Sequence, residues 1–226
     1  MSFNNIDTLL FDLDGTLIDS VPDLTNSANF ALRHIGLPER SEVEIRSWVG
    51  NGVDLLIHRT ITGSLDGLAP TNQHQQAKQY FYEWYSAHSA DLSRRYPGVI
   101  DTLNRLHSAG FKLACVTNKP ERFTQPLLDH FQIGHLFNAV VGGDSTATRK
   151  PDPEPLFHAV QLLGSSVTTS VMIGDSINDF QAAKNAKMAS IMVTWGYDQG
   201  IDLAELAPAA VIDDMTTLLK ILPALN

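Results

Sequence analysis

Two aspartates near the start of this chain stand out because of their spacing and their surroundings. Asp12 and Asp14 directly follow the apolar run at residues 8–11, and Gly15 and Thr16 come next. Side chains alternate across a strand, so residues i and i+2 leave it on the same side. If residues 8–11 form a buried strand, both carboxylates point into one site, an arrangement that suggests chemistry. A polar turn, in which Asp14 and Gly15 only close the strand, is the alternative for this segment taken alone.

Polar residues also follow a second predicted strand and precede a predicted helix. At the end of the strand predicted at residues 112–117, Thr117, Asn118 and Lys119 offer a hydroxyl, an amide and the N–H groups of a turn. These donors suit a phosphate group, although an ordinary capped turn between strand and helix would use the same residue types. Lys150 precedes a helix start marked by prolines, where a lysine is either a surface residue or a source of positive charge for an anion.

A second pair of acids follows the apolar run at residues 171–173. Asp175 stands at the predicted strand tip and Asp179 in the first turn of a predicted helix, so both can face one point, with helix capping as the alternative. Three or four carboxylates within a few ångströms repel each other by about 4 kcal/mol per pair at an effective dielectric of about 20, so such a group needs a cation. Oxygen ligands without sulfur or clustered imidazole favour Mg²⁺. Together with Lys150, the metal would create a local site for an anion.

The elements that must position these residues alternate between helix and strand after residue 96. We predict helices at residues 99–109, 122–131, 154–163 and 178–186, and strands at residues 112–117, 139–142, 170–174 and 189–193. A last strand is predicted at residues 210–212 and a closing helix at residues 215–222. This alternation predicts an α/β fold with a doubly wound parallel sheet, in which ligands bind at the carboxyl ends of the strands.

A block that is predicted to be all-helical lies between the first strand and this alternating region. The spacing of its apolar residues and its lack of strand signals predict helices at residues 22–36, 41–49, 53–60 and 72–90. The simplest organisation is a catalytic core formed by residues 1–18 and 92–226, with an inserted helical cap domain at residues 19–91.

Composition limits the classes of function that this sequence supports. The chain has 226 residues, 43% of them hydrophobic, and its net charge of −9 argues against binding to nucleic acid or anionic membranes. It has neither an export signal nor an apolar run long enough to span a membrane, so a cytoplasmic location is expected. The single cysteine, Cys115, lies in an apolar run and is expected to be buried and inert, and the eight histidines form no zinc motif. No feature of the sequence indicates an oligomeric state.

Four motifs, DLDGTL, VTNK, RKPDP and GDSIND, occur in this order, with the helical insertion after the first. Together they closely resemble the four motifs of the haloacid dehalogenase superfamily of phosphohydrolases, and the similarity spans the whole chain. This resemblance implies a Rossmann-like core with a small helical cap. It also implies Mg²⁺-dependent hydrolysis of a phosphomonoester through an aspartyl-phosphate.

The resemblance further implies a role for each motif residue. The expected catalytic residues are Asp12 as the nucleophile, Asp14 as the general acid/base, Thr117 as the hydroxyl that holds the phosphoryl group, and Lys150 as a charge stabiliser. The expected metal residues are Asp12, Asp14 and Asp175, with Asp179 supporting the metal or Lys150. An acid at position 14 would serve both half-reactions, because it becomes a base once it has protonated the leaving alkoxide.

The substrate is expected to meet residues from both parts of the chain. The expected phosphate-binding groups are backbone N–H groups around Leu13 and Gly15, together with Thr117, Asn118 and Lys150. Gly50, Asn51 and Gly52 resemble the loop that faces the active site in related capped phosphatases, and Arg46 is either a partner for a substrate carboxylate or an exposed surface residue. The expected partner is a small phosphorylated metabolite. Segments such as VVGGD and TWGYDQG are most similar to family members that hydrolyse 2-phosphoglycolate, with a sugar phosphate, a nucleotide or pyrophosphate as alternatives.

Two other classes of protein share part of this pattern. A receiver-type signalling module also combines an acidic Mg²⁺ site with a phosphoacceptor aspartate, a threonine and a lysine, but it resembles a single compact domain without a helical insertion. A serine esterase is suggested by Ser145 and Ser176, each preceded by Gly-Asp, although no histidine stands in a recognisable partner context. A long-lived phosphoprotein would favour the receiver. Activity that survives EDTA but is lost in Ser176→Ala would favour the esterase.

Overall fold

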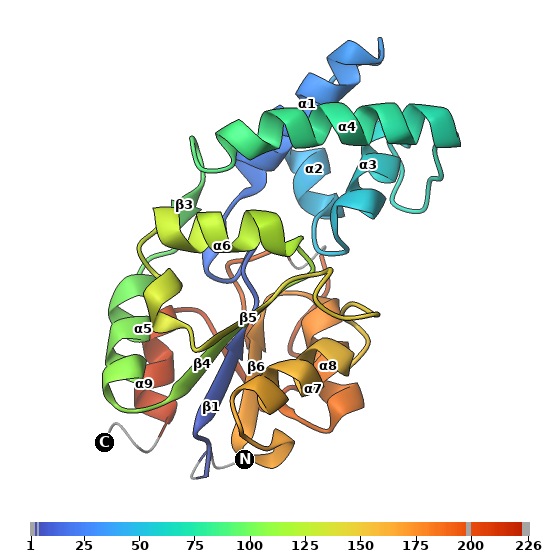
Figure 1. Cartoon of the computed structure of the whole chain (residues 1–226). Helices are drawn as coiled ribbons and strands as arrows, with labels where there is room; N and C mark the ends of the chain where they lie inside the picture. Colours follow the sequence, from blue (N-terminus) through green and yellow to red (C-terminus); the bar gives the residue numbers. More distant parts are fainter. Residues whose placement is uncertain (1–2, 4, 198–199, 223–226) are drawn as a thin grey trace.

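The core of the molecule is a parallel sheet with its first strand near the centre. The computed structural model describes Phe3, residues 5–197 and residues 200–222. Within these ranges, six strands pair in the order β5-β4-β1-β6-β7-β8, and each neighbouring pair is parallel (Figure 1). The strands are β1 (Thr8–Phe11), β4 (Lys112–Val116), β5 (Ala139–Val141), β6 (Ser170–Gly174), β7 (Ala189–Val193) and β8 (Ala210–Ile212). The predicted α/β parallel sheet is therefore confirmed.

The sheet is buried on both faces because its apolar side chains alternate between two layers of helices. Along β1, Leu9 and Phe11 pack on one face and Leu10 on the other. The first face is covered by α5 (Val99–Ser108), α6 (Glu121–His130) and α9 (Leu218–Ile221), and the second by α7 (Glu154–Leu162) and α8 (Ile177–Ala186). A strand that is buried on both faces reads as a continuous apolar run, which is why residues 8–11 are recognisable in the sequence.

A second group of helices lies over the carboxyl ends of the strands (Figure 1). It consists of α1 (Val21–His34), α2 (Glu42–Trp48), α3 (Val53–Thr62) and α4 (Thr71–His88), which share a hydrophobic core of their own. The chain enters this group through β2 (Ile18–Asp19) and leaves it through β3 (Arg94–Arg95), and these two short strands pair antiparallel. We call α1 to α4 the cap. The domain boundaries at residues 19 and 91 stay a prediction.

Several short elements are not predicted from the sequence. β2 and β3 contain two residues each, and 3₁₀ turns at Gly134–Leu136 and Val167–Thr169 contain three, so none is long enough to show a periodic apolar pattern. The closing helix predicted at residues 215–222 is divided into a 3₁₀ turn, Met215–Thr217, and the shorter helix α9.

Two predictions from composition are also tested by the structure. Cys115 is buried in β4, as predicted, and burial raises the pKa of its thiol above its ordinary value, which disfavours the reactive thiolate. In the described part of the chain, no helix has the length and apolar character needed to cross a membrane. The segment TWGYDQG includes Asp198 and Gln199, which lie outside the described residues.

Candidate active site

Three neighbouring strands bring the motif residues to one edge of the sheet. β1 pairs with β4 on one side and with β6 on the other, so that Phe11 lies opposite both Cys115 and Ile173. Because these strands are parallel, their carboxyl ends lie together, and the polar residues that follow them meet there. The Asp12 N–H donates to the Ile173 carbonyl at 2.9 Å, which extends the pairing of β1 to the first residue of the site.

Three buried carboxylates form a compact group at this edge. One oxygen from each of Asp12, Asp175 and Asp179 lies within 4.8 Å of the others, and these residues are 8%, 1% and 0% exposed. Asp12 follows β1, Asp175 follows β6, and Asp179 lies in the first turn of α8. The structure thus brings together the acids from the first and the last motif.

Hydrogen bonds fix the orientation of two of these carboxylates. Thr16 Oγ1 donates to Asp175 Oδ1 at 2.6 Å, and the Tyr197 N–H donates to Asp175 Oδ2 at 2.7 Å. Asp179 Oδ2 accepts from the N–H and the hydroxyl of Ser176, which forms a capping box at the start of α8. Asp179 therefore caps a helix and also belongs to the carboxylate group, so the two explanations for this residue are compatible.

Lys150 supplies positive charge to this group from within the protein. Its Nζ lies 2.6 Å from Asp179 Oδ1 and 2.9 Å from Asp12 Oδ1, and it donates to the Val116 carbonyl at 2.6 Å. Lys150 is 3% exposed, so it is not a surface lysine. Burial alone lowers the pKa of the ammonium, but the charges of Asp12 and Asp179 outweigh burial and hold that pKa above its ordinary range.

One ammonium does not balance three buried carboxylates. Burial raises the pKa of Asp12 to about 7 although Lys150 opposes the rise, and the charge of Asp179 adds to it. Burial also raises the pKa of Asp175 well above its ordinary value, with further repulsion from Asp12 and Asp179. The group therefore carries an excess of negative charge that a divalent cation would neutralise.

The donor set fits a hard divalent cation such as Mg²⁺. Its atoms are carboxylate oxygens, and Asp12 Oδ1 is buried and accepts no hydrogen bond of normal geometry from the described residues, although Lys150 is near it. Gly15 allows the close packing of this region, because its φ is +92° and a Cβ there would lie 2.2 Å from Asp175 Oδ2. Asp14, which is also predicted as a metal residue, is not part of this group of side chains.

We expect added Mg²⁺ to raise the melting temperature more at about pH 7.5 than at about pH 5. Because the pKa values of Asp12 and Asp175 are raised, the metal-free folded state holds protons that the unfolded state has already lost between the ordinary pKa of 3.8 and about 7. The stability of the metal-free folded state therefore falls as pH rises through this interval. A bound cation replaces the lost protons, so the increase in melting temperature that it causes becomes larger. Differential scanning fluorimetry with Mg²⁺ or EDTA across this range measures the difference.

Matched variants test the assignment of this effect to the carboxylate group. Asp175→Asn is expected to remove most of the pH dependence of the Mg²⁺ effect, whereas Asp213→Asn, at an exposed position after β8, is expected to leave it unchanged. A Mg²⁺ effect of the same size at both pH values would contradict the assignment.

Asp14 has partners of its own, separate from the carboxylate group. Lys119 Nζ lies 3.0 and 3.1 Å from the two carboxylate oxygens of Asp14, and Ser20 Oγ donates to Asp14 Oδ1 at 2.6 Å. The side chain of Asp14 is 13% exposed, so a ligand can reach it. Because β1 ends at Phe11, the alternation of a strand does not continue to Asp14, and the carboxylates of Asp12 and Asp14 have different neighbours.

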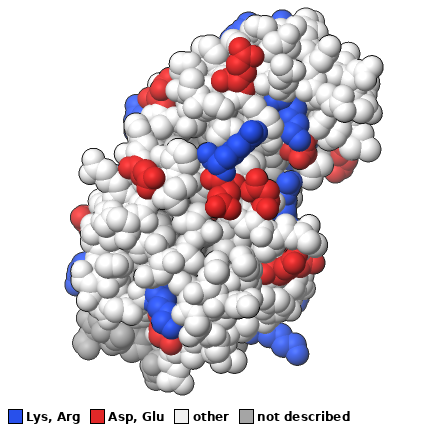
Figure 2. Space-filling model, viewed as in Figure 1, with Lys and Arg blue, Asp and Glu red and all other residues white. Residues whose placement is uncertain are grey.

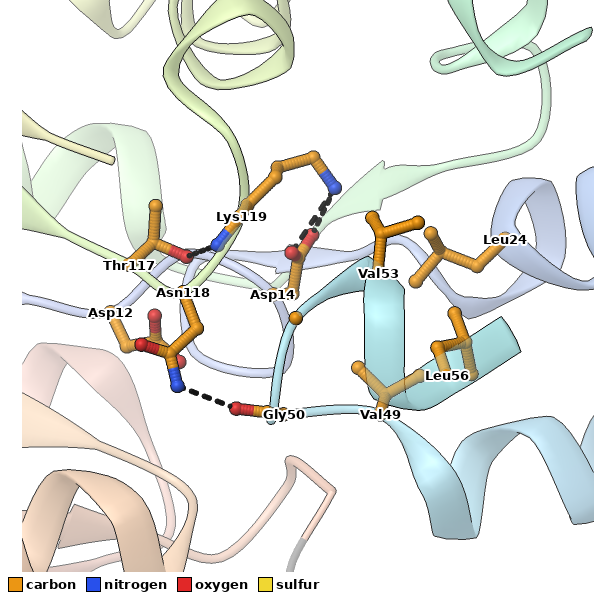
Figure 3. Close-up of a pocket in the computed structure, with 11 residues that line it drawn as sticks. Asp12, Asp14, Leu24, Val49, Gly50, Val53, Leu56, Thr117, Asn118 and Lys119 are labelled. Carbon is orange, nitrogen blue, oxygen red and sulfur yellow. Dashed lines mark hydrogen bonds and ion pairs between the residues drawn. The ribbon is translucent and has the colours of Figure 1, made fainter. Parts of the chain in front are cut away.

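A cavity between the core and the cap nevertheless contains both aspartates (Figure 3). Its core side is lined by Asp12, Asp14, Thr117, Asn118 and Lys119. Its cap side is lined by Leu24, Val49, Gly50, Gly52, Val53 and Leu56. The core side is polar and charged, whereas the cap side consists of aliphatic side chains and glycines. Such a cavity suits a ligand that directs an anionic group to the core and has a small remainder under the cap.

The loop between α2 and α3 closes this cavity by bonding to the core. Asn118 Nδ2 donates to the Gly50 carbonyl at 2.9 Å (Figure 3), and Asn178 Nδ2 donates to the same carbonyl at 3.2 Å. Asn51 Nδ2 donates to Asn178 Oδ1 at 3.1 Å. The predicted cap loop thus lies at the site, with Gly50 and Gly52 on the cavity wall and the Asn51 side chain directed to a core residue.

Two groups that are predicted to bind phosphate instead donate hydrogen bonds to carbonyl groups of the protein. The Gly15 N–H donates to the Ile18 carbonyl at 2.9 Å, in the turn that follows the two aspartates. The amide nitrogen of Asn118 donates to the carbonyls of Gly50 and Lys150, each at 2.9 Å. In this conformation Asn118 therefore joins the cap loop to the Lys150 loop, and its amide hydrogens are not directed to a phosphate.

Of the other residues that are predicted to bind the substrate, some line the cavity and others do not. Thr117 lines the cavity, whereas Leu13 is fully buried, so that only its backbone could take part. Arg46 is not among the residues that line the cavity. Its guanidinium pairs with Asp19 of β2 at 3.3 Å, and this ion pair joins the cap to the strand through which the chain enters it. The guanidinium also lies 5.0 Å from the centroid of the Tyr197 ring.

Two residues of this site have no role in the sequence-based prediction. Lys119 is expected there only as part of a turn, yet its ammonium contacts Asp14. Tyr197 is missed as well, although its N–H bonds to Asp175 and its hydroxyl donates to Asp19 at 2.7 Å. A lysine directly after Thr117 and Asn118 is a signal that could have been used, but nothing in the local sequence connects Tyr197 to the acids.

Charged side chains of both signs gather along the boundary between cap and core on the face shown in Figure 2. Asp54 of α3 pairs with Lys78 of α4 at 2.5 Å and lies 3.9 Å from the Arg149 guanidinium of the core. Arg149 also donates to the Gly143 carbonyl at 2.6 Å. Partly exposed ion pairs contribute only about 0–1 kcal/mol each, so these contacts are secondary to the bonds of the cap loop.

The fold and the site define a class of protein, an α/β protein with a parallel sheet and a helical cap over an acidic site at the strand ends. A family model described as haloacid dehalogenase-like hydrolase matches residues 9–193, and the chain belongs to this family. The resemblance inferred from the four motifs is thus confirmed.

Individual relatives are similar to this chain over nearly its whole length. The phosphoglycolate phosphatase of Vibrio cholerae is 44% identical over 220 residues, covering 96% of this chain and 97% of that protein. The phosphoglycolate phosphatase of Nitrosococcus oceani is 39% identical over 214 residues, covering 95% of each. A crystal structure described as a predicted phosphoglycolate phosphatase from Haemophilus somnus has a TM-score of 0.91 at 37% identity, covering 96% of this chain and 98% of that one.

Proposed function

We propose that the protein is a Mg²⁺-dependent phosphomonoester hydrolase that converts 2-phosphoglycolate to glycolate and phosphate through an aspartyl-phosphate. The observation that carries this proposal is the position of Asp12, whose carboxylate belongs both to the acidic group and to the wall of the cavity. A phosphate that enters the cavity therefore meets Asp12, whose buried Oδ1 lies 2.9 Å from Lys150 Nζ and whose carboxylate belongs to a group suited to a divalent cation.

In the first half-reaction, a carboxylate oxygen of Asp12 attacks phosphorus, and the bond from phosphorus to the ester oxygen breaks. Asp14 gives a proton to the departing alkoxide oxygen, so the product leaves as an alcohol. Asp12, Asp175 and Asp179 would hold Mg²⁺, which supplies charge neutralisation for the phosphoryl oxygens and the attacking carboxylate when it is bound. Asp14 can do this work because it lines the same cavity as Asp12.

In the second half-reaction, Asp14 acts as a base, since it has given up its proton. It takes a proton from a water molecule, whose oxygen attacks the phosphorus of the acyl phosphate. The bond between the Asp12 oxygen and phosphorus then breaks, phosphate leaves, and both carboxyl groups return to their starting states.

Lys150 and Thr117 contribute charge and position. The ammonium of Lys150 is fixed by Asp179 and the Val116 carbonyl, so it stabilises charge near Asp12 without having to rearrange. The hydroxyl of Thr117 lines the cavity and is placed to donate to a phosphoryl oxygen.

The choice of substrate rests on the named relatives and on the cavity. The phosphoglycolate phosphatases of Vibrio cholerae and Nitrosococcus oceani cover nearly the full chain. Aliphatic side chains such as Leu24, Val53 and Leu56 form the cap wall, which suits a substrate with a small remainder beyond the phosphate. Sugar phosphates, nucleotides and pyrophosphate are the alternative substrates for the same chemistry.

The two other classes considered from the sequence fit the site less well. The hydroxyl of Ser176 donates to Asp179, and that of Ser145 donates to Glu121 at 2.9 Å, so each is directed to a carboxylate. A serine nucleophile needs a base that accepts its proton in a triad arrangement. A receiver module resembles a single compact domain, whereas here a helical cap covers the proposed phosphoacceptor.

A screen of phosphomonoester hydrolysis tests the proposed function. With Mg²⁺ present, kcat/KM for 2-phosphoglycolate is expected to exceed that for sugar phosphates, nucleotides and pyrophosphate by at least about tenfold, and EDTA is expected to abolish the activity. If kcat/KM for a sugar phosphate exceeded that for 2-phosphoglycolate by about a hundredfold, or roughly 2.7 kcal/mol, the proposed substrate would be wrong. The proposed reaction mechanism would be unaffected. Full activity in EDTA would contradict the chemistry itself.

A further inference from the structure

The cavity contains a buried ammonium for which the proposed reaction has so far no use. Of the eleven described residues that line it, Lys119 alone is a cation. Lys119 is 5% exposed, and its Nζ donates hydrogen bonds to both carboxylate oxygens of Asp14, at 3.0 and 3.1 Å. Figure 3 shows its side chain extending from the Thr117 side of the cavity to Asp14. Lys150 and Arg149, which are also near the site, are not among the residues that line the cavity.

The surroundings of Lys119 hold its ammonium at this place as a cation. Besides contacting Asp14, its Nζ lies 4.8 Å from the centroid of the Tyr85 ring in α4, within the range of a cation–π contact. An ammonium has three N–H donors, so the two Asp14 oxygens leave a third, for which the Tyr85 hydroxyl is the nearby acceptor that a ligand carboxylate would replace. A buried charge is costly unless it is paired, and a buried ammonium in a ligand cavity is most useful where the ligand itself is anionic.

A second feature of the cavity adds positive potential on the cap side. Gly52 and Val53, the N-cap and first residue of α3, both line the cavity. Gly52 has no side chain and so makes no side-chain cap hydrogen bond, and the one acid in the first turn of α3, Asp54, pairs with Lys78. The N-terminus of a helix favours negative charge. Both the core wall and the cap wall thus offer a place for an anionic group in addition to the phosphate.

The proposed chemistry restricts where that anionic group can lie. The ester oxygen that leaves has to contact Asp14, because Asp14 protonates it. In a phosphorylated 2-hydroxy acid, the carboxyl carbon is two covalent bonds from this oxygen. The substrate carboxylate is therefore held close to Asp14, within reach of the Lys119 ammonium that contacts it.

We propose that Lys119 determines specificity by binding the carboxylate of a phosphorylated 2-hydroxy acid while the ester oxygen contacts Asp14. This inference rests on the proposed function and extends it, because it assigns the substrate class to one side chain of the core. The cap then excludes large substituents, and Lys119 selects for a carboxylate group attached to the carbon that carries the ester oxygen.

A pair of substrates of similar size tests the role of Lys119. Ethyl phosphate carries a methyl group where 2-phosphoglycolate carries a carboxylate, so the ratio of the two kcat/KM values measures recognition of that group alone. Because a hydrogen bond to a charged group contributes about 1.5–3 kcal/mol, Lys119→Met is expected to lower this ratio by roughly 10- to 100-fold, mainly through KM for 2-phosphoglycolate. Lys119→Arg is expected to retain part of the ratio, and Lys184→Met, at an exposed position of α8, the whole of it.

The outcomes distinguish this inference from the proposed function. If the ratio is high in the wild type and unchanged in Lys119→Met, the lysine only positions Asp14, and the inference is wrong while the function stands. If the wild type itself does not prefer 2-phosphoglycolate to ethyl phosphate, the proposed substrate is wrong and the inference falls with it.

Product inhibition gives a second measurement that does not require the variant to fold. Glycolate is expected to inhibit the wild type at least about tenfold more strongly than glycolamide, its neutral analogue, because only glycolate offers a charged acceptor to Lys119. Equal inhibition by the two compounds would overturn the inference.

Discussion

Asp12→Asn is expected to lower kcat by at least about 10⁴-fold while the protein stays folded. The amide oxygen has the shape of the carboxylate oxygen but lacks its charge, so it neither attacks phosphorus effectively nor neutralises a divalent cation. A loss of this size corresponds to about 5.5 kcal/mol of transition-state stabilisation. In EDTA the variant is expected to melt at the same temperature as the wild type or above it, because burial disfavours the charge that the substitution removes.

Three measurements separate loss of the nucleophile from loss of the fold. They are kcat with 2-phosphoglycolate, the melting temperature in EDTA, and the mass of the peptide that contains residue 12 after an acid quench during turnover. We expect a phosphoryl adduct on that peptide in the wild type and in Asp213→Asn, and none in Asp12→Asn. An adduct on another aspartate, or more than about 1% of wild-type kcat in Asp12→Asn, would contradict the assignment of Asp12.

Lys150→Met is expected to lose stability as well as activity. The ammonium is the partner of Asp12 and Asp179 in the buried group, and its removal leaves their charges uncompensated. Breaking a buried pair in this way costs about 3–5 kcal/mol, which lowers the melting temperature of a chain of this size by roughly 6–20 °C. The kcat is expected to fall by at least about 100-fold, because a preorganised positive charge beside the nucleophile is lost.

Mg²⁺ provides a direct check on this explanation. If Lys150 acts by compensating charge, Mg²⁺ is expected to restore more of the melting temperature in Lys150→Met than it adds to the wild type. Lys184→Met replaces an exposed lysine of α8 by the same residue and controls for the substitution. A melting temperature within about 2 °C of the wild type in EDTA would show that the buried carboxylates do not depend on Lys150.

The framework of the site is predictable from the sequence because it depends on local patterns. Short apolar runs that end in polar residues reveal β1, β4 and β6, and the rule that parallel strands end at one edge then brings Asp12, Thr117 and Asp175 together. The helices of the cap are predictable for the same reason. Their apolar positions recur at helical spacing, and Gly36 lies just beyond α1.

The interactions of the site with the cap are not predictable in this way. The bond from Asn118 to the Gly50 carbonyl and the contact of Lys119 with Tyr85 join residues that are far apart in the sequence. Such contacts depend on how the cap is placed on the core, and no local pattern encodes this placement. The contrast between Asp12 and Asp14 has a similar origin, because strand alternation ends at Phe11 and a turn decides where Asp14 points.

The pairing of β2 with β3 has a consequence for the evolution of this molecule. Ile18 lies opposite Arg95 and Asp19 opposite Arg94, so the inserted segment begins and ends at neighbouring points of the core. Its ends are held together whatever its length, and the entropic cost of a longer or shorter insertion grows only slowly with the number of residues. Helices can therefore be exchanged, lengthened or lost in the insertion without displacing the strands that carry the reacting groups, and new substrates can be acquired while the chemistry is inherited unchanged.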